Sequence, residues 1–551
     1  MTRIALATAL FGALCALPAR SDAFCGFYVA GSNDAMYNDA TQVVMMREGT
    51  RTVLAMQNDY NGPPQDFAMV IPVPTVLHEG DVKTLPREVF AHVEQMGAPR
   101  LVEYWEKDPC EPEPDYEMAA MAAPTGMAMQ ASAGGNAIRR GVTIEAQFVV
   151  GEYQILILSA KDSTGLDGWL HDQHYNIPAN AEPLLRPYVE SGMKFFVAKV
   201  DPKKVKFVDV PAPRSGSASP GLVRRAALSP LRFHYDAEDF ALPIRLGLAN
   251  SSGTQDLIVS IFAPHQRYDV ANYKNTTIPT NIDVADSVKG KFGAFYAALF
   301  DRTVAQNPGS VVTEYAWQAT GCDPCPGPML AASELATLGA DVLGGSKGKP
   351  APLDNMMDLV LTRLHARYGT DITNDLVFKQ ASPIVGGREF MTDGATRKLE
   401  EGARPDSINN FQGRYAIRHE WTGPIICAQP MRHRWGGPPG DQPAPPTQAA
   451  TNLAFQPRNE IALPQVVLRD LPEIGIKSTA RGAKLTEDAT KPTAPVKPTD
   501  PKAPLDNYAP RPPAAKTGCG CDSSDPGSLA AGLAAAAMLV RRRRPRAKTA
   551  R

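Results

Sequence analysis

The sequence lacks every short motif that would assign it to a common enzyme class. It contains no G-x-S-x-G nucleophile turn, no phosphate-binding or dinucleotide-binding glycine pattern, no protein-kinase signature and no H-E-x-x-H zinc motif. Two catalytic carboxylates that come together only in the folded chain would not form a short sequence motif. A hydrolase therefore stays open as an alternative. The absences favour a binding or structural role over an enzymatic one.

The chain also lacks an excess of charge of either sign. Lysine and arginine number 57 and the acidic residues number 58, so the composition gives no general attraction to nucleic acid or to an acidic surface. Proline and glycine are abundant, with 50 and 44 residues, and they favour loops and short strands over long helices. We therefore expect no nucleic-acid partner, and nothing in the composition calls for a cofactor.

Cysteine is scarce, with eight residues in a chain of 551. In an exported protein the five in the body would form disulfides, and their odd number leaves one thiol free or paired with the C-terminal tail. The spacing Cys322-Asp-Pro-Cys325 favours a structural disulfide, local or to another cysteine, with a thiol–disulfide redox pair as the alternative. A zinc site would need ligands that no second CxxC supplies. The disulfide candidates are Cys25, Cys110, Cys322, Cys325 and Cys427.

Residues 1–23 predict a secretory signal peptide. One early charge, Arg3, precedes an apolar run over residues 4–18, and residues 21–23 form a small-x-small cleavage site. The mature chain would begin at Phe24. The N-terminus therefore predicts export.

The last 34 residues, 518–551, predict a membrane-associated segment. An apolar run over residues 528–540 spans about 20 Å as a helix, short of a hydrocarbon core of about 30 Å. Long arginine side chains can extend the effective span, and their charge favours the cytoplasmic side. Two cysteines precede the run and four arginines follow it: Cys519, Cys521, Arg541, Arg542, Arg543 and Arg544.

This order resembles a myxobacterial-type C-terminal sorting tag, which consists of a cysteine motif, a hydrophobic helix and a basic end. The resemblance implies processing by a membrane protease during delivery to the cell surface. The second cysteine and the acidic and serine residues at 522–525 depart from that pattern. They leave the processing site open.

Between its two ends, the sequence predicts an α+β body that is mainly antiparallel β-sheet with a few short helices. A Ser/Pro/Gly-rich break over residues 211–221 divides it, and residues 478–517 are rich in Pro, Lys, Thr and Ala, as in an extended linker. The predicted units are a β-rich N-terminal domain at 24–210 with a mobile insertion at 111–137, a second α+β domain at 222–477, the linker at 478–517 and the tag at 518–551.

Local patterns predict individual elements of this body. Residues 41–47 and 51–56 favour a hairpin, and alternation over 142–148 predicts a half-buried strand. Residues 85–104 favour a helix that is interrupted at a proline. Apolar residues at helical spacing predict the clearest helix over 353–367. Asp354 lies in its first turn, and Arg363 and Arg367 lie near its end, as suits the helix dipole.

Two histidine-containing segments are candidates for chemistry. On a helix, His171 and His174 would share a face beside Asp172 and could hold zinc or copper, although such residues more often lie on the surface or in packing. The segment 419–439 gathers aromatic, basic and Gly/Pro residues around Cys427. It predicts either a ligand cleft or an ordered loop packed on the sheet through cation–π contacts.

Six stretches of the body stand out as family-like motifs. They are FCGFYV at 24–29, the run from DATQVV to VIPVP at 39–74, LVEYWEKDPC at 101–110, GLDGWLHDQHYNIP at 165–178, GCDPCPGP at 321–328 and HEWTGPIICAQPMRHRWGGPP at 419–439. Together these stretches resemble the uncharacterised bacterial family DUF2330. The resemblance implies an exported envelope protein and supplies no activity and no catalytic residues.

We therefore expect a non-enzymatic protein of the cell envelope, exposed at the outer surface, that binds a ligand or has a structural role. Its partners would be the membrane, through the C-terminal segment, and the machinery of export and C-terminal processing. One alternative is an extracellular hydrolase with a site near His171, His174 or residues 419–437. The other is a redox protein that uses Cys322 and Cys325.

Overall fold

The structure of the chain is a computed structural model. It describes residues 27–480 except 31–36, 62–66, 112–136, 140–141, 174, 176–180, 212–221, 251–254, 345–357, 370–373, 389, 394–395, 401, 441, 454–455, 457 and 459. The predicted signal peptide, most of the insertion at 111–137, the linker and the C-terminal tag lie outside this range. Within the described range, no helix combines the length and the apolar character needed to cross a membrane.

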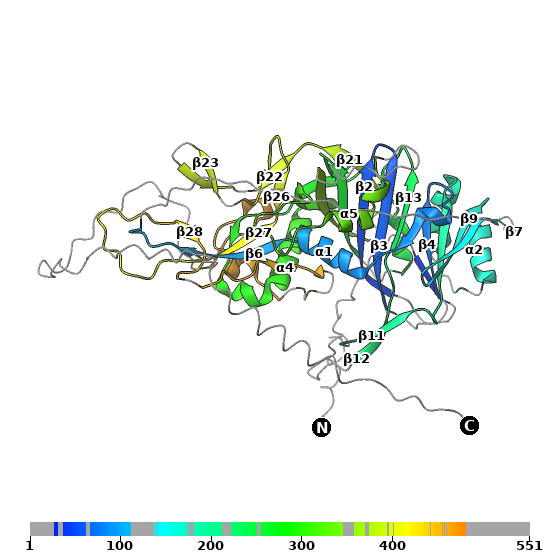
Figure 1. The fold of residues 1–551 in the computed structure, drawn as a ribbon, viewed down its shortest axis with the longest axis horizontal. Helices are drawn as coiled ribbons and strands as arrows, with labels where there is room; N and C mark the ends of the chain where they lie inside the picture. The colour runs from blue at the N-terminus through cyan, green and yellow to red at the C-terminus, as the bar shows by residue number, and fades with distance from the viewer. Residues whose placement is uncertain are drawn as a thin grey trace, which may run out of the picture. The chain divides into compact units, whose positions relative to one another are not determined.

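Two large sheets dominate the body, which confirms the α+β class (Figure 1). The six-stranded sheet has the order β1 (Phe27–Ala30), β4 (Phe67–Val73), β10 (Lys194–Val200), β9 (Tyr153–Ala160), β8 (Val142–Val150) and β7 (Ala137–Arg139). The eleven-stranded sheet runs β25 (Arg404–Pro405), β22 (Ile384–Gly386), β26 (Asn410–Gln412), β19 (Ser310–Gln318), β20 (Leu359–Tyr368), β15 (Gln255–Pro264), β2 (Tyr37–Glu48), β3 (Arg51–Asn61), β13 (Leu231–Asp236) and β5 (Val82–Thr84), with β17 (Lys274–Thr277) beside β19.

Smaller sheets and short helices complete the body. A five-stranded sheet contains β18 (Ile282–Asp283), β27 (Arg414–His419), β6 (Arg100–Glu106), β28 (Trp435–Gly436) and β29 (Gln448–Ala449). The remaining strands are β14 (Ala241–Leu242), β21 (Leu376–Ala381) and β16 (Arg267–Val270), β11 (Lys206–Pro211) with β12 (Leu222–Ala227), and β23 (Phe390–Asp393) with β24 (Thr396–Leu399). The helices are α1 (Arg87–Gly97), α2 (Ser163–Asp172), α3 (Ala181–Glu190), α4 (Phe292–Gln306), α5 (Ala332–Leu338) and α7 (Leu463–Val466).

The predicted hairpin at 41–56 is confirmed as β2 and β3. Glu48 pairs with Arg51, and the connecting Gly49 has a φ of 56°, a left-handed conformation that glycine adopts without steric cost. Successive side chains of a strand point to opposite faces of its sheet. Both faces of this hairpin are apolar, so it lies inside the body and contributes to two cores.

Alternation along the strands arranges the two large sheets and the helices in four layers. In β4, Met69 and Ile71 point into the core between the sheets, whereas Ala68 and Val70 point toward α2 and α3. On the far side of the eleven-stranded sheet, α1 and α5 cover the outward residues of β2 and β3. Figure 1 shows α1 crossing in front of this sheet and α2 beyond the six-stranded sheet.

The predicted helix over 353–367 is wrong, because most of that range belongs to strand β20. β20 pairs with β15 on one side and β19 on the other. Leu361 faces the α1 layer and Leu364 faces the six-stranded sheet. A strand that is buried on both faces loses the apolar–polar alternation of a half-buried strand, and its apolar run can match a helical spacing.

Two other predictions have mixed outcomes. Residues 85–104 contain α1, but the chain after Pro99 forms strand β6. The domain boundary at 211–221 stays a prediction, since residues 212–221 are outside the described range. Strands from before and after that range, among them β3 and β13, pair directly in the eleven-stranded sheet.

A fully buried carboxylate, Glu314 on β19, joins the eleven-stranded sheet to α4. It accepts hydrogen bonds from Arg363 Nε at 2.7 Å, from His365 Nδ1 at 2.7 Å and from Tyr296 Oη at 2.5 Å. Phe300 of α4 stacks on the His365 ring, with centroids 3.6 Å apart. We call Glu314, Arg363, His365 and Tyr296 the Glu314 cluster. It fixes how α4 lies on β19 and β20.

A second acidic centre continues this network toward the surface. Asp256 on β15 accepts from Arg367 Nε at 2.8 Å and from Arg458 Nη2 at 2.6 Å. Both arginines also bind Asp301 of α4. His365 Nε2 lies 3.6 Å from Asp256, so one histidine ring stands between the two buried carboxylates. The network therefore ties Arg458 to the core as well as α4.

Replacing Glu314 should be strongly destabilising. Glu314→Gln removes the only full negative charge that contacts Arg363 in the described structure, and we expect the free energy of unfolding to fall by about 3–5 kcal/mol. Asp236→Asn is the matched control, because it breaks a pair with Arg51 in which Asp236 is 56% exposed, and it should cost about 1 kcal/mol or less. Urea unfolding of both variants measures the difference. Equal effects would contradict a structural role for the Glu314 cluster.

The same cluster predicts an acid-sensitive stability. Burial alone would raise the pKa of the Glu314 carboxyl, but His365 and Arg363 lower it to about 2. A carboxyl whose pKa is depressed by folding stabilises the native state above its unfolded pKa, and that contribution is lost as the pH falls from about 5 toward 2. Stability measured over this interval should decline less steeply in Glu314→Gln than in the natural chain. If the free energy of unfolding falls equally steeply in Glu314→Gln and in the natural chain, Glu314 is not a main source of the acid sensitivity.

Candidate functional site

The parallel pairing of β6 with β27 brings together charged side chains from distant parts of the sequence. Glu103 of β6 accepts from His419 Nε2 at 3.1 Å and from Lys289 Nζ at 2.7 Å. The His419 ring stacks on Trp105, with centroids 4.5 Å apart. These four residues form the Glu103 cluster. Burial raises the pKa of the Glu103 carboxyl, but Lys289 and His419 outweigh burial and lower it, so Glu103 is a fixed negative charge.

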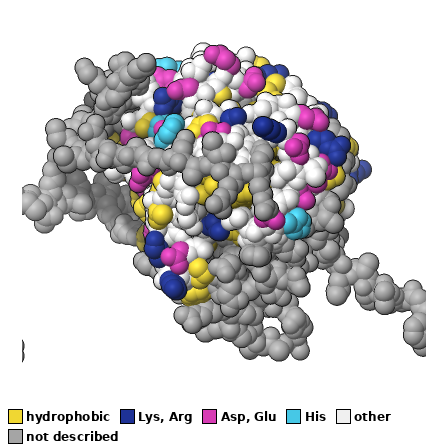
Figure 2. Space-filling model, turned by 90° about the vertical axis from the view of Figure 1, so that its right-hand side faces the viewer, with side chains coloured by type: hydrophobic (Ala, Val, Ile, Leu, Met, Phe, Trp, Pro, Cys, Tyr) yellow, Lys and Arg dark blue, Asp and Glu magenta, His cyan; other side chains and the backbone are white. Residues whose placement is uncertain are grey.

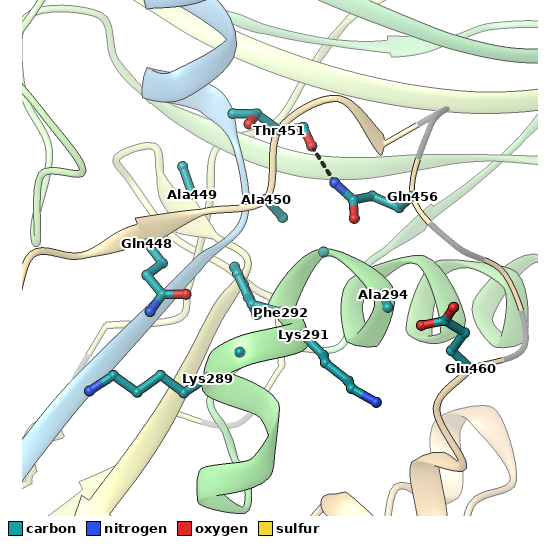
Figure 3. A pocket seen from close by; sticks show the side chains of 12 residues that line it. Lys289, Lys291, Phe292, Ala294, Gln448, Ala449, Ala450, Thr451, Gln456 and Glu460 are labelled. Atoms are coloured by element: carbon teal, nitrogen blue, oxygen red, sulfur yellow. Dashed lines mark hydrogen bonds between the residues drawn. The ribbon is translucent and has the colours of Figure 1, made fainter. Parts of the chain in front are cut away.

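A pocket of about 320 Å³ adjoins the Glu103 cluster at the start of α4 (Figure 3). One wall is the turn that precedes α4, with Lys289 and Lys291, and the other is formed by residues 448–451 together with Gln456 and Glu460. Gln456 Nε2 donates to the Thr451 carbonyl at 3.1 Å, which holds the second wall together. In Figure 3 Lys289 and Lys291 extend in different directions from the turn. A small polar ligand with an anionic group would suit this lining.

The segment 419–439 is an ordered loop that is built around a second carboxylate, Glu106. Glu106 accepts from the guanidinium of Arg432 at 2.7 and 2.9 Å, and from the backbone N–H groups of Trp421 at 2.9 Å and His433 at 2.6 Å. Burial raises the pKa of the Glu106 carboxyl, but Arg432 and the two backbone donors lower it. All of these contacts organise the loop on the end of β6.

Cation–π contacts and a disulfide reinforce the same loop. The Arg418 guanidinium lies 5.3 Å from the centre of the Tyr104 ring and 4.9 Å from that of Trp435. A disulfide joins Cys110 to Cys427, with Cα atoms 5.4 Å apart and a sequence separation of 317. Ile426, the residue before Cys427, is 73% exposed. The geometry is thus that of the packed loop, one of the two possibilities that the sequence leaves open.

The other cysteines and histidines of the sequence predictions do not converge on this region. Cys322 and Cys325 form a local disulfide, with Cα atoms 5.0 Å apart. His171 lies on α2, 55% exposed, with its Nε2 3.7 Å from Asp167. His174 and Cys25 lie outside the described residues, as do Cys519, Cys521 and the four terminal arginines.

Metal-ligating side chains do not gather elsewhere in the described structure either. In the part of the chain with assigned positions, no three His, Cys, Asp or Glu side chains are arranged to hold a metal ion.

The α2 end of the body carries basic and acidic side chains interspersed with one another, which matches the balanced composition (Figure 2).

Sequence reasoning missed Glu103, Glu106 and Lys289. Both glutamates lie in LVEYWEKDPC, a stretch that matches no catalytic or ligand-binding motif. A signal was present, since two acidic residues stand three apart in an otherwise apolar and aromatic strand. Their partners follow more than 180 residues later, and no local pattern links them.

The contacts of Glu106 predict a local effect of its removal. Glu106→Ala leaves two backbone N–H groups and Arg432 without their acceptor, so amide exchange over 420–434 should accelerate at least about tenfold, for a loss of about 1.5–3 kcal/mol. Hydrogen exchange with peptide mass spectrometry measures this, and the hairpin at 43–56 should stay protected. Glu420→Ala, at an exposed neighbouring position, is the control. Unchanged protection over 420–434 in Glu106→Ala would show that the loop does not depend on Glu106.

Comparisons with known proteins place this architecture in a family. The family model of uncharacterised proteins conserved in bacteria, DUF2330, matches residues 19–379. The matched range includes α4, Glu103 and the Cys322–Cys325 disulfide, and it ends before the 419–439 loop. No curated protein and no solved structure matches the chain. The chain belongs to the DUF2330 family of uncharacterised bacterial proteins.

Proposed function

We propose that this chain is an exported protein of the cell envelope, held at the cell surface through residues 518–551, whose α+β body acts as a binding or structural module. The observation that carries the proposal is the Cys110–Cys427 disulfide, which joins β6 to a loop 317 residues later. Disulfides of this kind persist in oxidising compartments and are rare in the reducing cytosol. An oxidising location agrees with the signal peptide that residues 1–23 predict.

The charged side chains of the candidate site support binding over hydrolysis. A general acid needs a carboxyl whose pKa is raised toward the working pH, whereas the pKa values of Glu103 and Glu106 are both lowered. Each of these carboxylates is occupied by donors that position neighbouring elements. The pocket beside them presents lysines and a glutamate, which suits recognition of a polar ligand.

Deleting residues 518–551 tests the anchoring part of this proposal. The contacts of the described body extend to Ala480, whose N–H donates to Pro464 O, so the deletion removes none of the described contacts. We expect the full chain to fractionate with the cell envelope, and the shortened chain to appear in the medium with the Cys110–Cys427 disulfide closed.

The control for this experiment is the full chain with Arg541, Arg542, Arg543 and Arg544 each replaced by glutamine, which removes the basic end and keeps the apolar run. This variant should be retained less well than the natural chain, since the arginines supply the charge that favours the cytoplasmic side. A shortened chain that stays bound to cells would overturn the anchoring role of residues 518–551.

A further inference from the structure

The loop that carries Cys322 and Cys325 is held in place by hydrogen bonds as well as by its disulfide. We call residues 321–328 the CxxC loop. Arg100 Nη1 donates to Pro324 O at 2.7 Å, Gln95 Nε2 donates to Pro326 O at 2.8 Å, and Gln412 Nε2 donates to Asp323 O. The donors come from α1, β6 and β26. The loop backbone is therefore fixed by three elements that do not depend on the sulfur–sulfur bond.

One more contact holds the end of the loop. His92 of α1 places Nδ1 2.7 Å from Glu334 Oε1 and Nε2 2.7 Å from Pro328 O. Burial lowers the pKa of the His92 imidazole, but the hydrogen bonds to Glu334 and Pro328 O outweigh burial and raise it. The protonated ring and the Glu334 carboxylate together add no net charge beside the loop.

The two cysteines of the disulfide differ in exposure. Cys325 is exposed, whereas Cys322 is half-buried and packs against the apolar core under α1 and α5. An attacking thiolate therefore reaches Cys325 and leaves Cys322 as the departing sulfur. Exchange chemistry needs this kind of access to one sulfur.

A buried positive charge lies directly beneath the loop. Arg100 is fully buried, and besides Pro324 O its guanidinium donates to Met96 O at 2.7 Å and lies over the Tyr315 ring. Arg414, its register partner on β27, donates to Asn281 Oδ1 and to the Tyr104 hydroxyl. Asp323, on the exposed side of the loop, is the nearby negative charge. A guanidinium held against the backbone of a CxxC loop, as Arg100 is, favours thiolates and so makes the disulfide easier to reduce.

The second disulfide of the chain provides a contrast. Cys110 and Cys427 are both half-buried, and their bond closes a loop of several hundred residues. A disulfide that closes a long loop stabilises the fold more than one between residues three apart. Reduction of Cys110–Cys427 therefore lowers the stability of the folded state. Reduction of Cys322–Cys325 leaves the hydrogen bonds of its loop in place.

From these observations we propose that Cys322–Cys325 is a thiol–disulfide exchange site whose substrate is a dithiol of another protein. A partner thiolate attacks Cys325 Sγ, the bond to Cys322 breaks, and its electron pair leaves on Cys322 Sγ, which takes up a proton. The second thiolate of the partner then attacks the partner's first sulfur, which is bound to Cys325 in the mixed disulfide. The partner disulfide forms, and Cys325 departs as a thiolate. The partner is oxidised by two electrons, and the CxxC pair is reduced by two. The proposal is independent of the anchoring function proposed above.

The first test is a redox titration of the full, oxidised chain with dithiothreitol as the dithiol probe. After acid quenching and alkylation, peptide mass spectrometry reads each cysteine separately, Cys25, Cys519 and Cys521 included. We expect Cys322 and Cys325 to become half-reduced at a ratio of reduced to oxidised dithiothreitol that is at least about tenfold lower than for Cys110 and Cys427, with unchanged circular dichroism. Reduction of both pairs at one ratio, together with unfolding, would overturn the proposal and make the pair structural.

A second test compares two single variants that leave one cysteine of the pair each. Cys322→Ser keeps the exposed Cys325, and Cys325→Ser keeps the half-buried Cys322. We expect Cys325 to react faster with iodoacetamide than Cys322, with a thiol pKa below the ordinary value of about 8.5. A Cys325 thiol that titrates at or above that value and reacts no faster than Cys322 would refute the exchange site. The titration of the natural chain decides the question if either variant fails to fold.

Discussion

The Glu314 carboxylate is the interaction on which the arrangement of the body depends. It is fully buried, and its partners come from β20 and α4. Arg363, one of these partners, also donates to Glu94 O of α1. The eleven-stranded sheet, α4 and α1 are therefore linked through one charge and its partners. Buried ion pairs add less to net stability than apolar side chains of equal size, but Arg363 and His365 reach Glu314 in only one register of β19 against β20, so the cluster specifies that register.

The same network extends to the candidate site. Arg458 joins Asp256 and Asp301 to the segment that forms one wall of the pocket, and α4, which carries Tyr296 and Asp301, begins at the other wall. The pocket is thus framed by elements that the core already fixes. Glu103 and Glu106 repeat this principle along β6, where each carboxylate accepts hydrogen bonds from β27 or from the 419–439 loop. Fixed charges of this kind suit recognition better than proton transfer.

The sequence predicted the local parts of this fold and missed those that depend on distant residues. The hairpin at 41–56 is a short-range pattern around a glycine turn, and it was predicted correctly. β20 was mistaken for a helix because it is buried on both faces and carries arginines whose acidic partners lie on β19, β15 and α4. Glu103 meets His419 across 316 residues, and a single sequence has no signal for such a contact. The sequence identified the cysteines as disulfide candidates, but only the folded structure shows which cysteines pair.

The two disulfides connect the fold to the proposed location of the protein. Peptide mass spectrometry without reduction, on protein taken from its native cells, tests this account most directly. We predict a mature chain that begins at Phe24 and a linked peptide that contains both Cys110 and Cys427. A chain that retains residues 1–23 and carries Cys110 and Cys427 as free thiols would contradict export and the oxidised fold together.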